Sequence, residues 1–155
     1  MERLYLPDFP GTRYRVSLVR EDDVSNSSES VKPILNPEDA YQYVRGGLES
    51  KDREFFVSIL LDAKNVPLGV SLISIGDLTC SVVHPREVFK AAILASASGI
   101  IVAHNHPSGS PAPSKDDLRV TFMLKQAGEI INIPLLDHII VGRDTYYSMK
   151  QSGRL

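Results

Sequence analysis

With 155 residues, 43% of them hydrophobic, the chain is long enough for one globular domain and too apolar for a disordered protein. Its 17 basic and 19 acidic side chains give a net charge of −2, which provides no electrostatic footprint for nucleic acid. The sequence contains no apolar stretch that could cross a bilayer and no signal-peptide pattern at its start. One cysteine, Cys80, cannot form an internal disulfide or a zinc knuckle, so we expect a cytoplasmic protein.

Residues 1–35 carry the weakest structural signals, and we expect an N-terminal extension there, of unassigned role. Alternating polar and apolar side chains predict a strand over residues 14–19. The Ser-rich, acidic segment over residues 21–30 is typical of a linker. We therefore expect the folded domain to occupy residues 36–155.

The domain alternates between helical and strand patterns. Apolar stripes and capping signals predict helices over 37–45, 86–97 and 115–127. Gly46 and Gly47 weaken the end of the first helix, and Gly128 stands where a C-terminal helix glycine is expected. Runs rich in Phe, Val, Ile and Leu, bounded by turn residues, predict strands over 54–61, 67–75, 78–83, 99–103, 133–141 and 145–149. Loose alternation with hairpins favours an α/β fold with a mixed sheet.

Two histidines directly follow the apolar run that ends at Ala103. His104 and His106 are two residues apart at a strand end, so their side chains point the same way and can bind one ion. After a turn-rich loop, Ser114 is typical of a helix N-cap, and Asp117 lies in the first helical turn. Two histidines and one carboxylate leave a fourth tetrahedral position open, which is typical of a catalytic zinc site.

A capped helix explains part of this pattern without a metal. Ser114 and Asp117 form a variant of the capping box, and acidic residues are common at helix starts. The pair of histidines is harder to explain in this way. The residues alone therefore leave both a metal site and a polar loop open.

The spacing His-x-His-Pro, six further residues and Ser-x-x-Asp resembles the signature of the JAMM metalloproteases, also called the JAB or MPN-plus family. The string His-Asn-His-Pro-Ser-Gly is most similar to the RadC branch of this family. The resemblance extends over residues 36–155 and includes four further blocks, at 53–56, 61–65, 84–89 and 137–142. It implies a JAB/MPN-type mixed β-sheet flanked by helices, with a layout similar to that of the cytidine deaminases.

The resemblance also implies one zinc ion (Zn2+), bound by His104, His106 and Asp117, and a metal-activated water. Zinc lowers the pKa of such a water towards about 7, but a carboxylate must still carry its proton to the leaving amine. Glu54 stands where the family has this general acid/base. Ser114 matches a serine that stabilises the oxyanion.

Other candidate residues receive structural interpretations. Glu87, the rival for the general base, is typical of an exposed acid in the first turn of a helix. Apolar residues flank His84 and His138, and neither has a metal-spaced partner, so we expect structural roles. His138 follows Asp137, which leaves a supporting role near the metal open but without evidence. Cys80, within a strand pattern, is interpreted as a small buried hydrophobic residue.

These observations favour a zinc-dependent metallohydrolase that cleaves an amide or isopeptide bond in a protein or peptide. The RadC name carries a DNA-repair label, so the alternative is a protein that binds nucleic acid or a repair partner with little or no peptidase activity. A third class, a JAMM-like scaffold without catalysis, usually lacks the metal ligands retained here. An HNH nuclease would disperse its three residues, and the Pro-Cys-x-x-Cys signature of zinc deaminases is absent. The sequence does not identify the substrate, and it leaves open whether the protein forms a homo-oligomer.

Overall fold

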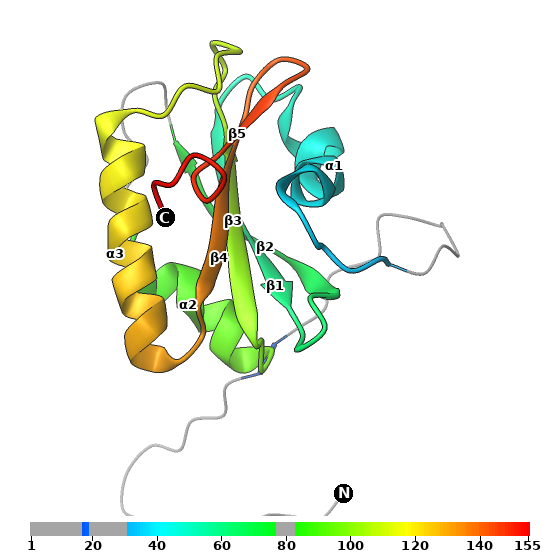
Figure 1. Cartoon of the computed structure of the whole chain (residues 1–155), viewed down its shortest axis with the longest axis vertical. Helices are drawn as coiled ribbons and strands as arrows, with labels where there is room; N and C mark the ends of the chain where they lie inside the picture. Colours follow the sequence, from blue (N-terminus) through cyan, green and yellow to red (C-terminus); the bar gives the residue numbers. More distant parts are fainter. Residues whose placement is uncertain (1–16, 19–30, 77–82) are drawn as a thin grey trace, which may run out of the picture.

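The computed structural model describes residues 17–18, 31–76 and 83–155. Within these residues a five-stranded sheet forms the centre of the molecule, in the order β2-β1-β3-β4-β5 (Figure 1). Strands β3 and β4 run parallel, and the other neighbouring pairs run antiparallel. The predicted α/β class with a mixed sheet is therefore confirmed. The strands are β1 (Glu54–Leu61), β2 (Pro67–Gly76), β3 (Gly99–Asn105), β4 (Leu135–Val141) and β5 (Tyr146–Ser148).

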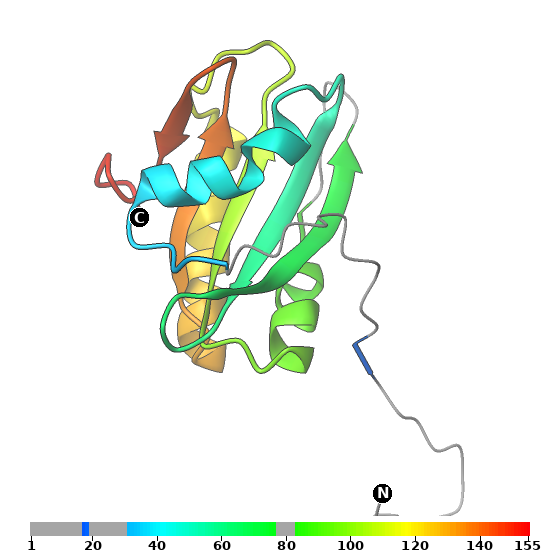
Figure 2. The same ribbon diagram turned by 90° about the vertical axis from the view of Figure 1, so that its right-hand side faces the viewer.

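Helices cover both faces of the sheet. Helix α1 (Pro37–Leu48) lies on one face, while α2 (Pro85–Leu94) and α3 (Lys115–Ile131) lie on the other (Figures 1 and 2). Helix α1 packs chiefly on β3 and β4, whereas α2 packs on β1, β2 and α3. No helix in the described part of the chain has the length and apolar character needed to span a membrane.

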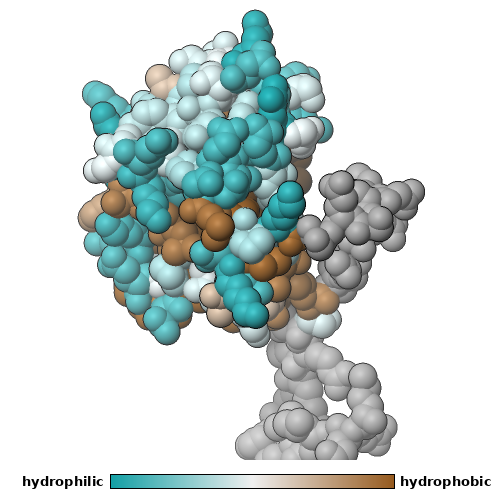
Figure 3. Space-filling view, turned by 45° about the vertical axis from the view of Figure 1, so that its right-hand side comes forward, coloured by the Kyte–Doolittle hydropathy of each residue, from teal (hydrophilic) through white to brown (hydrophobic). Residues whose placement is uncertain are grey.

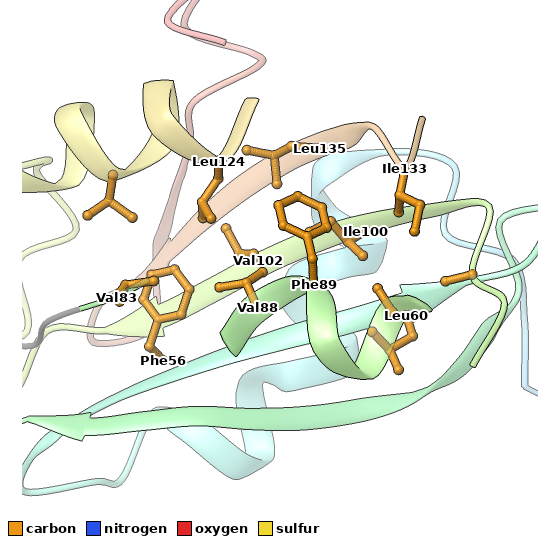
Figure 4. Close-up of a cluster of buried hydrophobic side chains, with 13 residues drawn as sticks. Phe56, Leu60, Val83, Val88, Phe89, Ile100, Val102, Leu124, Ile133 and Leu135 are labelled. Atoms are coloured by element: carbon orange, nitrogen blue, oxygen red, sulfur yellow. The ribbon is translucent and has the colours of Figure 1, made fainter. Parts of the chain in front are cut away.

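Two apolar clusters fill the space between these layers. One joins the sheet to α2 and α3 and includes Phe56, Val88, Phe89, Val102 and Leu124 (Figure 4). The other joins the opposite face to α1. Every residue of the central strand β3 is buried, as expected for a strand covered on both faces. The polar side chains at the C-terminal end of β3, His104 and Asn105, are therefore buried as well and need hydrogen-bond partners.

Strand β2 is less well covered than the other long strands. Its exposed side chains are apolar, and Figure 3 shows apolar surface on this side of the molecule. Because α1 lies mainly over β3 and β4, it leaves this end of the sheet face open. The exposed residues are Leu68, Val70, Leu72 and Ile75.

Most predicted elements are confirmed, with changes at their ends. Strand β1 has its predicted bounds, and β3 continues past Ala103 to include His104 and Asn105. Helix α1 runs through Gly46 and Gly47 to Leu48, where its side chain packs in the core. Helix α2 ends at Leu94, earlier than predicted, because Ser96 takes a left-handed conformation with φ of 53°. The last two strands begin later than predicted, at Leu135 and Tyr146, and the final strand also ends earlier, at Ser148.

The prediction that Gly128 ends its helix is wrong. Helix α3 continues to Ile131, and the left-handed residue that caps it is Asn132, with φ of 58°. A Cβ atom on Gly128 would lie 2.6 Å from the carbonyl oxygen of Ile133. Gly128 is therefore needed for the close return of the chain towards β4, and not for a turn.

Several predictions fall on residues outside the described ranges. These are the strand over 14–19 apart from Ser17 and Leu18, the linker over 21–30, the strand over 78–83 apart from Val83, and the burial of Cys80.

Candidate metal centre

The candidate metal centre lies where β3 ends and α3 begins. His104 is the penultimate residue of β3, and His106 follows the strand directly. The backbone N–H of His106 donates to the carbonyl of Val141 at 2.9 Å, so the chain stays paired with β4 beyond the end of the strand. The two histidine side chains therefore point to the same side of the sheet. In Figure 1 the loop after β3 rises above the sheet and enters the start of α3.

Asp117 is held by the predicted capping box, which is confirmed. The N–H of Asp117 donates to Ser114 Oγ at 3.1 Å, and the N–H of Ser114 donates to Asp117 Oδ2 at 2.7 Å. This reciprocal pair fixes the carboxylate against the first turn of α3. The other oxygen, Oδ1, lies 3.2 Å from His104 Nε2.

The three side chains form a group whose ligand atoms all lie within 4.8 Å of one another. The Nε2 atoms of His104 and His106 are 3.0 Å apart, and His106 Nε2 is 3.5 Å from Asp117 Oδ2. In a tetrahedral site with metal–ligand distances of about 2.0–2.1 Å, neighbouring ligand atoms are about 3.3–3.4 Å apart. The observed spacings of 3.0, 3.2 and 3.5 Å bracket this value, so the group fits a small cation.

The loop fixes the proton of His106. Its Nδ1 lies 2.8 Å from the carbonyl oxygen of Ser110, which can only accept a hydrogen bond. The proton of the neutral ring is therefore on Nδ1, and Nε2 presents its lone pair to the cluster. The loop is itself backed by Gly142, where a Cβ atom would lie 2.6 Å from the carbonyl oxygen of Gly109.

Two pKa shifts show how closely charged groups gather at the site. Burial opposes ionisation of Asp117, but contacts with His104, His106 and the Ser114 N–H outweigh it and hold the pKa of this carboxyl well below its ordinary value. The Asp117 carboxylate in turn raises the pKa of His106, while burial lowers it. The negative charge of Glu54 adds to the increase in the pKa of His106. Both shifts express the attraction between the Asp117 carboxylate and the imidazole rings beside it.

Glu54 stands beside this cluster on the neighbouring strand. It begins β1, two residues before Phe56, which pairs with His104 across the sheet and stacks on its ring at 5.7 Å between centroids. Side chains two apart on a strand share a face, so Glu54 lies on the face of the histidines. Glu87, by contrast, is bound to Lys90 Nζ at 2.5 Å and to Arg86 at 3.5 Å.

Asn105, between the two histidines, faces the other way. Its Oδ1 accepts from the N–H of Phe55 at 2.8 Å, and its Nδ2 donates to the carbonyl of Arg53 at 2.8 Å. It therefore ties the end of β3 to the backbone on both sides of Glu54. Its role is to hold β1 in place.

The sequence predicts a structural role for His138, and it does not mark Thr121 at all. In the structure His138 Nε2 lies 2.8 Å from His104 Nδ1, and His138 Nδ1 lies 2.7 Å from Thr121 Oγ1. Burial lowers the pKa of His138 well below its ordinary value, so its ring is neutral. The sequence signal that could have indicated these contacts is the position of His138, a polar residue inside an apolar strand, because a buried polar group needs a hydrogen-bond partner. His84, the fourth histidine, is exposed at the N-cap of α2.

Asp137 does not support the site through His138. Its carboxylate accepts hydrogen bonds from the N–H groups of His138 and Lys150 and from the hydroxyl of Ser148. These contacts join β4 to β5 and the chain that follows it. Asp137 therefore has a structural role at the edge of the sheet.

Comparison with known proteins agrees with this architecture. The UPF0758 protein of Desulforamulus reducens is 51% identical over 120 residues, which cover 77% of this chain and 53% of the relative. Those of Rubrobacter xylanophilus and Methanosarcina acetivorans are 49% and 43% identical over 125 residues, which cover 80% and 81% of this chain and 55% of each relative. The chain thus spans about half the length of the curated relatives it matches, and their names state no activity. Residues 34–154, which include the whole cluster, match the family model of the RadC-like JAB domain, and the chain belongs to this family.

Proposed function

We propose that the protein is a zinc-dependent metallohydrolase of the JAB type, which cleaves an amide or isopeptide bond in a protein or peptide. His104, His106 and Asp117 hold one zinc ion, and Glu54 is the general acid/base. The observation that supports this most strongly is the convergence of three electron-pair donors at distances of 3.0, 3.2 and 3.5 Å.

Such a cluster is unfavourable unless a cation lies within it. His106 has its proton on Nδ1, bound to Ser110, so its Nε2 faces His104 and the Asp117 carboxylate as a bare lone pair. One proton can relieve the repulsion between only two of the three donors, whereas a divalent cation can bind all of them. Two imidazoles and a carboxylate are a ligand set that zinc accepts readily, with a position left for water or substrate.

Different side chains of the protein would then carry out different steps of the reaction. When bound, zinc supplies Lewis acidity and lowers the pKa of water towards about 7. The Glu54 carboxylate accepts a proton from the attacking water and returns it to the nitrogen of the leaving amine. The hydroxyl of Ser114, which accepts from the N–H of Asp117, donates no hydrogen bond within the described part of the chain, so its proton can be directed at the developing oxyanion.

The test combines zinc content with cleavage of a peptide library that includes isopeptide-linked members. We expect the wild-type protein to hold one zinc per chain and the double variant His104→Ala/His106→Ala to lose it while remaining folded. Glu54→Gln should keep its zinc because Glu54 is not a ligand. Its cleavage rate should fall by roughly 10²–10⁴-fold, the usual contribution of a general acid/base.

Glu87→Gln is the matched control, because it makes the same change in an acid paired with Lys90 and Arg86. Zinc content and cleavage should both stay at wild-type values. Full zinc retention in the double variant would refute the ligand set. A rate loss in Glu87→Gln but not in Glu54→Gln would refute the choice of base, and no cleavage by the zinc-loaded wild type would favour a binding module.

A further inference from the structure

We propose that His138 and Thr121 are positioning residues that set the tautomer of His104 and turn its Nε2 lone pair towards the metal. This role rests on the proposed metal site and adds two residues that are not themselves ligands. The observation that supports this role is a chain of hydrogen bonds that runs from His104 through His138 and Thr121 to the backbone of Asp117. We call this chain the imidazole relay.

Each bond of the imidazole relay has one workable direction. The Asp117 carbonyl can only accept, so Thr121 Oγ1, 2.6 Å away, donates its single proton there. Thr121 Oγ1 must then accept from His138 Nδ1 at 2.7 Å, which places the proton of the neutral His138 ring on Nδ1. His138 Nε2 is left as an acceptor, and His104 Nδ1 donates to it at 2.8 Å. His104 therefore presents an unprotonated Nε2 to the cluster.

The opposite direction would prevent metal binding. A proton on His138 Nε2 would make His104 Nδ1 the acceptor and move the proton of His104 to its Nε2. That atom lies 3.0 Å from His106 Nε2 and 3.2 Å from Asp117 Oδ1, where the ion must bind. A protonated imidazole nitrogen cannot coordinate a metal. The hydroxyl of Thr121 thus decides, two hydrogen bonds away, whether His104 can serve as a ligand.

The surroundings keep the imidazole relay in this arrangement. His104 and His138 are fully buried and Thr121 is 1% exposed, so water has no access to replace a partner. Phe56 stacks on the ring of His104 and meets the ring of His138 edge-on at 5.5 Å between centroids. Ring rotation, which would exchange the two nitrogens of either histidine, is therefore blocked by packing.

Different contacts fix the protons of the two proposed histidine ligands. The proton of His106 is fixed by the carbonyl of Ser110 in the loop, whereas that of His104 is fixed by the imidazole relay across β4 and α3. Removal of the Thr121 hydroxyl should therefore disturb His104 and His138 and leave the tautomer of His106 unchanged. A general loss of packing would not single out these rings.

The test uses Thr121→Val, which keeps the branched shape and removes the hydroxyl. Imidazole ¹⁵N NMR of the metal-free wild-type protein should show His138 protonated on Nδ1. In Thr121→Val, His138 should shift towards the Nε2-protonated form, and His104 should lose its pure Nδ1-protonated signature. Zinc affinity, measured by competition with a chelator, should fall by roughly 10–100-fold, the usual effect of losing a group that orients a ligand.

Thr121→Ser is the matched control, because it restores the hydroxyl, and both the spectra and the zinc affinity should return to wild-type behaviour. Thr121→Ala removes the same hydroxyl with less bulk and serves if Thr121→Val does not fold. Unchanged His104 and His138 spectra in the hydroxyl-free variants would overturn the imidazole relay. Wild-type protein that binds no zinc would instead refute the metal site, while the spectra of the metal-free protein would still decide the direction of the relay.

Discussion

Gly142 follows β4 at the point where the chain turns against the loop of the metal centre. A Cβ atom there would lie 2.6 Å from the carbonyl oxygen of Gly109 and 2.9 Å from Cδ of Pro111. The backbone of Gly142 does not need positive φ, so Gly142→Ala adds a steric clash without conformational strain. The clash is with backbone and a proline ring, which cannot yield as a flexible side chain would.

Two contributions make up the expected loss of stability in Gly142→Ala. Overpacking of a close contact costs about 1–3 kcal/mol. Displacing the loop also weakens the hydrogen bond from the N–H of Arg143 to the carbonyl of Gly109, now 2.9 Å long, which is worth about 1 kcal/mol. We therefore expect Gly142→Ala to lower the free energy of unfolding by about 2–4 kcal/mol.

The displacement of the loop in Gly142→Ala should also disturb the proposed metal ligands. Ser110, whose carbonyl fixes His106, directly follows Gly109 in the same loop. Zinc affinity should therefore fall by roughly 10–100-fold, as when a group that orients a ligand is lost. Urea denaturation of the chelator-treated protein measures the change in the free energy of unfolding, and competition with a chelator measures the change in zinc affinity.

The chain offers the same substitution where there is room for it. Gly47 is exposed within α1, and a Cβ atom there would meet nothing within 4 Å. Gly47→Ala should raise the free energy of unfolding by about 0.5–1 kcal/mol through the better helix propensity of alanine, without changing zinc affinity. If Gly142→Ala matched Gly47→Ala in both measurements, the close approach of the loop to β4 would be refuted.

Two further predictions concern pH and nucleic acid. In the metal-free protein the folded-state pKa of His106 lies above its ordinary value of 6.5. The stability that protonation of His106 contributes is therefore complete below pH 6.5 and is lost as the pH rises through the raised pKa. The urea midpoint of chelator-treated protein should fall over that range, and His106→Ala should remove this pH dependence. With a net charge of −2, the protein should bind duplex DNA weakly and with steep salt dependence. Tight, salt-resistant and sequence-selective binding in a titration would favour the repair alternative.

Local signals explain why much of the site could be predicted. The contacts that form the capping box join Ser114 to Asp117, only three residues apart, and the two histidines depend only on the alternation of one strand. Strand β1 is equally local, since its apolar run is bounded by turn residues. These patterns specify their geometry without knowledge of the rest of the fold.

Contacts between distant segments explain what the sequence could not provide. His138 reaches His104 from 34 residues away because β3 and β4 pair in parallel, with Val102 opposite His138. That register depends on how the two strands and α3 pack together. The same applies to Gly128, whose small size is required by the returning carbonyl of Ile133 and not by its own helix. A residue pattern alone does not report such approaches.

Asn105 shows how one strand end organises both the ligands and the proposed base. Side chains alternate along the end of β3, so the two histidines point to one face and Asn105 points to the other, where it is only 2% exposed. A carboxylate that is not a ligand has no metal bond to hold it, so its backbone must be fixed by other means. Asn105 binds the carbonyl of Arg53 and the N–H of Phe55, the two neighbours of Glu54. The string His-Asn-His therefore holds the two proposed ligands and, between them, the side chain that fixes β1 beside them. We expect the distance from the proposed base, Glu54, to the metal to depend on Asn105.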